Sequence, residues 1–226
     1  MNKAFKLFFP VFIGCFSSTI VVAQINDFGA ISSFAVSENF GRNSSLKLEE
    51  ELRFDQNINS FNRAKTTLGL NYSLFRKLLV AELDYNFLYL KSDNIYECRH
   101  RASFGLSTGT GVRRFDLGFK TKIQSTWRDE LRGDYSYNPK YVWRNKLELD
   151  YDIFGAPIKP FVSGEIFCPL NGSKGFYLDG CRTTLGLKYK LTKHHSLDFS
   201  LLYDQEVQQS NPNGIIYGVV GWNYKL

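Results

Sequence analysis

The chain has 226 residues, 43% of them hydrophobic and 16% aromatic, which suits one domain of ordinary size. Its 28 basic and 22 acidic side chains are dispersed and leave a net charge of +6, without the clustered basic face of a nucleic-acid-binding protein. Three histidines and no closely spaced pair of cysteines argue against a metal site. We therefore expect no nucleic acid, no metal and no cofactor.

The first 23 residues are typical of a secretory signal peptide. Two lysines come first, an apolar stretch covers residues 7–22, and the small residue Ala23 ends the segment. Cleavage there would leave residues 24–226 as a single domain. Two alternatives are weaker: a retained membrane helix, which Pro10 disfavours, and a lipoprotein anchor at Cys15, which is not followed by a polar tether.

The rest of the chain alternates apolar and polar residues over long runs. In YVWRNKLELDYDI, residues 141–153, apolar groups occupy nearly every second position and charged groups lie between them. A period of two residues predicts a β-strand. Eleven such segments follow one another, and the alternation is clearest in residues 28–37, 46–54, 67–74, 79–89, 115–128, 141–153, 184–190, 196–204 and 218–226.

The length of these runs predicts a transmembrane antiparallel β-barrel. Strands of soluble sandwiches have about five or six residues, whereas about ten tilted residues cross a bilayer with apolar side chains toward lipid. Short connections near residues 76, 110, 155 and 193 alternate with longer ones at 128–139, 169–180 and 208–214. Short turns, and the chain end, are expected on the periplasmic side. Because bacterial barrels use even numbers of strands, we expect ten or twelve.

Charged residues on the inward phase of these strands are the candidate functional residues. We expect the lumen to contain Asp84, Arg99, Arg101, Lys120, Lys146, Glu148, Glu165 and Arg182. Hairpin register predicts the neighbours Asp84 and Arg101, Asn86 and Arg99, Lys146 and Glu165, and Lys120 and Glu148. Such charges either pair off and fill a narrow barrel or line a selective channel.

A lipid-acting hydrolase is the enzymatic alternative. His194 and Ser196 form a pattern in which an imidazole could activate a hydroxyl, with Glu206 as an orienting carboxylate. The histidine falls in a short periplasmic turn, far from outer-leaflet lipid. We therefore expect no catalysis.

Two cysteines flank the loop PLNGSKGFYLDG, and both share the outward phase of their strands. Cys168 and Cys181 are therefore either a disulfide or two free thiols. Cys98 has no partner in phase nearby and is expected to be a free thiol.

Several short motifs resemble, in the same order, one known family. They are EEELRF, LGLNYSL, RHR, WRNKLELDY, KPFVSGEIF and RTTLGLKYKLTKHHSLDFSLLY, which lie between residues 49 and 203. The family is the Bacteroidetes outer-membrane family filed as domain of unknown function 2490. The resemblance implies an outer-membrane β-barrel and no established activity.

The sequence thus predicts a small outer-membrane barrel with a charged, largely self-filled lumen and a structural or transport-related role. The alternatives are a narrow pore for small polar solutes, the hydrolase, and an adhesion or docking barrel acting through its outer loops. The expected partners are outer-membrane lipids and the barrel assembly machinery. The oligomeric state stays open.

Overall fold

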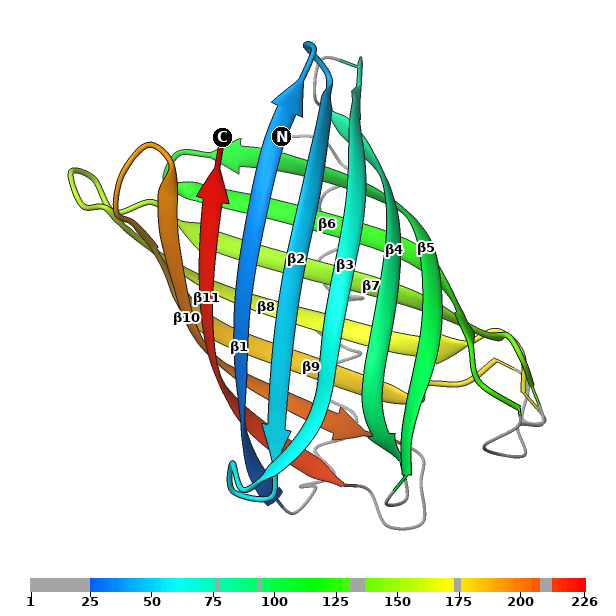
Figure 1. Cartoon of the computed structure of the whole chain (residues 1–226). Helices are drawn as coiled ribbons and strands as arrows, with labels where there is room; N and C mark the ends of the chain where they lie inside the picture. Colours follow the sequence, from blue (N-terminus) through cyan, green and yellow to red (C-terminus); the bar gives the residue numbers. More distant parts are fainter. Residues whose placement is uncertain (1–24, 76–77, 93–94, 131–136, 173–175, 208–212) are drawn as a thin grey trace.

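The computed structural model describes residues 25–75, 78–92, 95–130, 137–172, 176–207 and 213–226. The predicted signal peptide, residues 1–23, lies outside them. The described residues form eleven strands: β1 (Ile25–Phe40), β2 (Ser44–Asp55), β3 (Ser60–Leu74), β4 (Leu79–Ser92), β5 (Ile95–Val112), β6 (Phe115–Trp127), β7 (Lys140–Tyr151), β8 (Ile158–Pro169), β9 (Gly180–Lys190), β10 (His195–Glu206) and β11 (Gly214–Lys225). Each strand pairs with its neighbours in the chain, and β1 closes on β11 to complete a barrel (Figure 1). No helix in this part of the chain is long and apolar enough to span a membrane.

The barrel has an odd number of strands, so the expectation of ten or twelve is wrong for the described chain. All consecutive pairs are antiparallel, and an odd count leaves the first and last strands pointing the same way. β1 and β11 accordingly pair in parallel, from Gly29 opposite Tyr217 to Ser37 opposite Lys225. Because β1 and β11 pair in this way, the sheet has no open edge. A β-sheet that spans a bilayer must be closed, since an open edge would leave backbone groups unpaired in lipid.

The connections divide between two rims. At the turn rim, connections of two to six residues join the strands: residues 41–43, 75–78, 113–114, 152–157 and 191–194. β11 ends at the same rim. The other end, the loop rim, carries residues 56–59, 93–94, 128–139, 170–179 and 207–213, including the three longest connections, and β1 begins there. All the long connections share one rim, as predicted, but the loop rim also carries the short connections 56–59 and 93–94. The turn expected near residue 110 lies at 113–114 because β5 continues to Val112.

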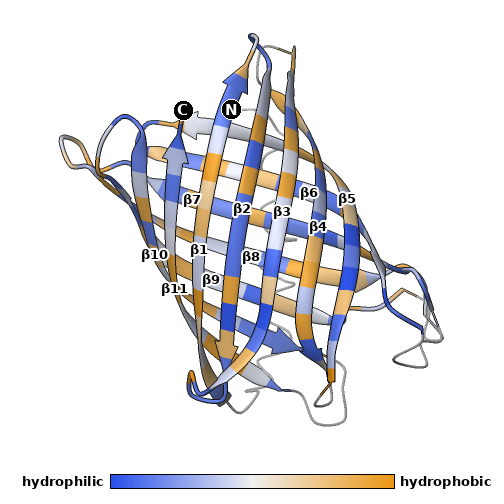
Figure 2. Cartoon of the chain, in the orientation of Figure 1, coloured by the Kyte–Doolittle hydropathy of each residue, from blue (hydrophilic) through white to orange (hydrophobic). Residues whose placement is uncertain are grey.

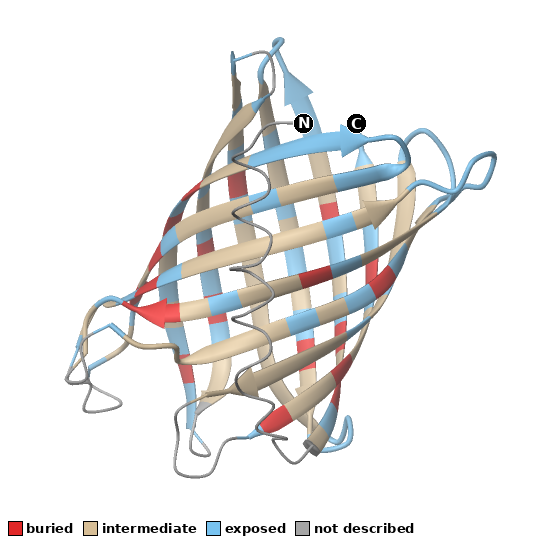
Figure 3. Cartoon of the chain, turned by 180° about the vertical axis from the view of Figure 1, so that it is seen from behind, coloured by how far each residue is buried: buried red, intermediate tan, exposed pale blue. Residues whose placement is uncertain are grey.

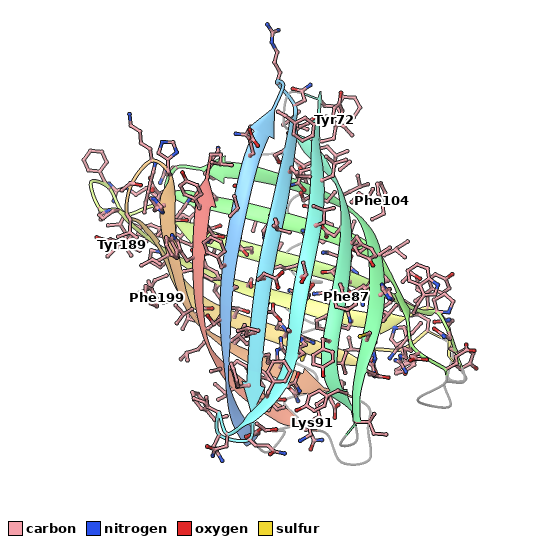
Figure 4. All side chains as sticks on the ribbon, in the orientation of Figure 1. Tyr72, Phe87, Lys91, Phe104, Tyr189 and Phe199 are labelled. Atoms are coloured by element: carbon pink, nitrogen blue, oxygen red, sulfur yellow. The ribbon has the colours of Figure 1, made fainter. Side chains whose placement is uncertain are left out.

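The outer surface is apolar along the middle of the strands. Hydropathy alternates residue by residue on each strand (Figure 2), and outward side chains such as Phe87, Phe104 and Phe199 stand away from the wall (Figure 4). Aromatic pairs lie toward both rims, with Tyr89 stacked on Tyr96 at a centroid distance of 5.4 Å near the loop rim. Apolar walls with aromatic girdles are the outer surface of a transmembrane barrel.

The interior is mainly polar. Buried positions are scattered along the strands (Figure 3), and among the described residues they include as many polar and charged side chains as apolar ones. Arg53, Asn86 and Glu97 are all below 9% exposed, although charged groups are rarely buried unless they are paired. The wall therefore separates an apolar outside from a polar lumen.

Candidate functional site: the charged lumen

A cavity of about 990 Å³ occupies the lumen. Its wall includes Ser73 and Val80, which lie next to the turn-rim ends of β3 and β4. It also includes Glu206 and Asn213, which flank the loop-rim connection between β10 and β11. The cavity thus extends from close to one rim to close to the other.

A second, smaller cavity of about 260 Å³ lies beside the first. Both cavities are lined by Ser33, Arg182, Leu202 and Val219. These four side chains form part of the wall between the two spaces. The lumen is therefore divided by side chains but is not filled by them.

The predicted lumen charges all lie on the inward face. The larger cavity is lined by Asp84, Arg101, Lys120 and Arg182. The smaller one is lined by Lys146, Glu165 and, again, Arg182. Glu148 and Arg99 form ion pairs with the inward-facing Lys146 and Glu97.

The predicted neighbours across the hairpin of β4 and β5 are wrong, because each residue stands opposite a partner two positions away from the predicted one. Arg101 stands opposite Asn86, and Asp84 stands opposite Ser103. The last pair of this hairpin is Ser92 with Ile95, so the turn centres one residue later than the sequence suggests. Because a one-residue shift of the centre moves every pairing by two residues, Asp84 and Arg101 are no longer partners.

The other two predicted pairings fare differently. Lys146 does stand opposite Glu165. Its ion pair is nevertheless with Glu148 on its own strand, at 2.6 Å between Nζ and Oε2. Lys120 stands opposite Lys146, and its ion pair is with Glu82 rather than with the predicted Glu148.

Five arginines form a belt toward the loop rim, which we call the arginine girdle. Each lies two to six residues from the loop-rim end of its strand, and each lines the larger cavity: Arg53, Arg63, Arg101, Arg144 and Arg182.

One side of the girdle is a chain of ion pairs across β7 to β10. Arg144 holds Glu165 with two parallel bonds, Nε to Oε1 and Nη2 to Oε2, each 3.0 Å long. Arg182 lies 3.9 Å from the same carboxylate and 2.5 Å from Asp204. Asp204 in turn lies 3.9 Å from Arg53, so this series of ion pairs extends to β2.

The other side of the girdle centres on Glu51. Its carboxylate lies 2.7 Å from Lys65, 3.3 Å from Arg63 and 3.9 Å from Arg53. Glu51 is therefore shared by three cations from β2 and β3. Shared pairing of this kind keeps buried charges compensated while the space between them stays polar.

Aromatic faces support three of the arginine side chains. The Arg53 guanidinium carbon lies 4.5 Å from the centroid of Tyr217. Phe167 faces both Arg144 and Arg182, at 4.8 and 5.2 Å. Cation–π contacts of this geometry fix the planes of the guanidinium groups.

Toward the turn rim, lysines and carboxylates pair in nearly equal numbers. Lys188 lies 2.6 Å from both Glu148 and Asp150, and Lys122, which stands opposite Arg144 and so lies at the level of the girdle, is 3.2 Å from Asp84. Lys47 pairs with Glu49 on its own strand. The excess of positive charge in the lumen is therefore concentrated at the girdle.

Sequence reasoning missed Arg63 of the girdle and the neighbouring Lys65. Both lie on the loop-rim half of β3, where the alternating outward positions are Ala64 and Thr66. These are too weakly apolar to extend the period-two signal, so the predicted strand began only at residue 67. Asp204 was recognised as polar, but its partner Arg53 on β2 is far away in the sequence.

The hydrolase pattern does not come together. His194 lies in the turn between β9 and β10, where its Nδ1 is 2.7 Å from the Lys225 carbonyl oxygen. Ser196 and Glu206 lie at opposite ends of β10, about 33 Å apart at 3.3 Å per residue. Within the described ranges no group of three or more His, Cys, Asp or Glu side chains could hold a metal ion.

The disulfide is absent, and all three cysteines of the described chain are free. Cys181 stands opposite Ile166 on β8, so Cys168 is its diagonal neighbour and not its direct partner. Diagonal residues have Cα atoms about 7–8 Å apart, beyond the usual reach of a disulfide. The alternative of two free thiols is the one that this register allows.

The chain is similar to one protein family and to solved porin structures. The model of the family described as "Protein of unknown function (DUF2490)" matches residues 28–214. A NanC porin in a rhombohedral crystal form aligns at 17% identity with a TM-score of 0.54, over 88% of this chain and 97% of that one. An anion-selective porin from Comamonas acidovorans aligns at 14% identity with a TM-score of 0.38, over 80% of this chain and 52% of that one.

No curated protein matches the chain. The first structural likeness is one of fold, since the identity is low. The family match spans most of the chain, from the first described strand to the start of the last. The chain, itself a closed β-barrel, therefore belongs to the DUF2490 family.

Proposed function

We propose that this protein is an outer-membrane barrel through which small polar solutes pass along a narrow, charge-lined lumen. The observation that carries the proposal is the cavity of about 990 Å³ whose wall reaches from near the turn rim to near the loop rim. The apolar outer wall supports a place in the membrane, and the predicted signal peptide supports export. The short turns would then face the periplasm and the long loops the exterior.

The dimensions favour small solutes. Spread over the thickness of a bilayer core, about 30 Å, the cavity has a mean cross-section of about 33 Å². This admits water and small solutes and excludes larger ones. Passage is expected to be slow as well as selective, because charged side chains line the path.

A bilayer recording tests the passage with two adjacent residues of β3. Asn71 lines the cavity, whereas Leu70 faces outward and is 41% exposed. We expect the wild-type protein to carry a weak but reproducible single-channel current. Asn71→Trp is expected to remove most of it, because the indole occupies the lumen, and Leu70→Trp is expected to leave it unchanged.

The matched pair separates blocking from unfolding, since both variants introduce the same side chain on the same strand. A wild-type protein that inserts but carries no current above the bare bilayer would contradict the proposal. So would equal currents in the two variants.

A further inference from the structure

We propose that the arginine girdle is a binding site for small solutes that carry a carboxylate, and that it makes the lumen selective for them. The inference rests on the proposed function, because the solute must enter the lumen to reach the girdle. It goes further in naming the site and the chemical class of the solute.

The first argument is the charge balance of the girdle. Within the described part of the chain, four of its five arginines form ion pairs, and they share three carboxylates, which are Glu51, Glu165 and Asp204. One of these carboxylates, Glu51, is shared with Lys65 as well. The girdle therefore carries more positive than negative charge, and this favours an anion in the adjoining cavity.

The second argument is Arg101. Among the described residues it forms no ion pair, and its polar contact is a 3.2 Å bond that Nε donates to the hydroxyl of Thr126. Its buried guanidinium is repelled by Arg63, Arg144 and Arg99, and is attracted more weakly by Glu51. A cation in such surroundings is unfavourable unless an anion compensates it. Because Arg101 lines the cavity, a solute can reach it.

The geometry favours a carboxylate. A guanidinium offers a planar fork that matches the two oxygens of a carboxylate. The girdle already uses this fork once, where Arg144 holds Glu165 with two bonds of 3.0 Å. Phe167 and Tyr217 hold three of the arginines from the side, so the forks are positioned before a solute arrives.

Calorimetric titration of the detergent-folded protein tests the site. The probe is glucuronate, and glucose is the neutral control of similar size. We expect the wild-type protein to bind glucuronate and not glucose. Arg101→Met is expected to weaken binding about tenfold or more, because a charge-assisted contact is lost, and Arg101→Lys is expected to keep part of it.

Lys47→Met is the matched control, because it removes one positive charge from the lumen wall near the turn rim. Glu49, the partner of Lys47, keeps Lys65 at 3.4 Å. We expect its affinity for glucuronate to equal that of the wild type. If Arg101→Met does not fold, Arg63→Met replaces it, since Glu51 would keep Lys65 and Arg53.

The outcomes are distinct. A wild-type protein that binds glucose as well as glucuronate, or neither, would overturn the carboxylate site. Equal weakening by Arg101→Met and Lys47→Met would show attraction by the overall charge and would also overturn it. Binding without any current in the bilayer recording would keep the site and overturn the passage, whereas current without binding would do the reverse.

Discussion

Replacement of Glu165 by glutamine is expected to lower the free energy of unfolding by about 3 kcal/mol. The carboxylate is 10% exposed and forms the two-bond contact with Arg144 as well as the longer contact with Arg182. Glutamine has nearly the same size, so packing is kept while the negative charge is lost. Its amide group would also present a donor where the guanidinium groups need an acceptor. Urea titration of the protein folded in lipid vesicles measures the difference.

The control is the same kind of change at an exposed ion pair. Asp116, which is 53% exposed, pairs with Lys159 at the turn rim. We expect Asp116→Asn to change the free energy of unfolding by less than about 1 kcal/mol, because exposed pairs contribute little. If both variants lost the same small amount, the ion pairs of the girdle would not be stabilising in the sense argued above.

A second large effect is expected on the outer wall, where Phe199→Arg should destabilise the barrel by about 2–4 kcal/mol in a bilayer. Phe199 is 45% exposed on the outward face of β10, midway between the rims (Figure 4). An arginine there would lie at the depth where lipid offers no hydrogen-bond partner. Tyr72→Arg is the control, because Tyr72 is 47% exposed but lies near the turn rim.

At the level of the headgroups an arginine costs about 0–1 kcal/mol, so the two variants should differ clearly. The readout is again the unfolding free energy in vesicles. Equal effects at the two positions would mean that the cost does not depend on depth, which is contrary to a wall in contact with hydrocarbon.

The fold was predictable because its main determinant is local. Strands that face lipid on one side and a wet lumen on the other must alternate apolar and polar residues. In β7 the outward Trp143 is followed by the inward Arg144. The strand count was misjudged for the opposite reason. The expectation of an even number is a rule about how barrels close. Here closure depends on the parallel pairing of β1 with β11, two strands at opposite ends of the chain.

The lumen was only partly predictable. The inward phase of Arg101 follows from the alternation, but its neighbours depend on the centre of a turn, and an error of one residue exchanged Asn86 for Asp84. The contact of Asp204 on β10 with Arg53 on β2 joins strands that are not neighbours, and it has no local signature. The place where pairing expectations failed most, around Arg101, is also the place where we locate the binding site, as expected when function opposes stability.

The central claim is that one face of each strand meets lipid and the other meets a water-filled lumen, and alternating cysteine accessibility along β4 tests it most directly. In a background with the native cysteines replaced by alanine, single cysteines would replace Leu83, Asp84, Tyr85 and Asn86 in turn. Asp84 and Asn86 line the cavity, whereas Leu83 and Tyr85 are exposed on the outer wall. With the protein in lipid vesicles, we expect a small charged methanethiosulfonate to label Asp84→Cys and Asn86→Cys and to leave Leu83→Cys and Tyr85→Cys unmodified. Equal labelling at all four positions, or labelling of the outward pair alone, would contradict the account.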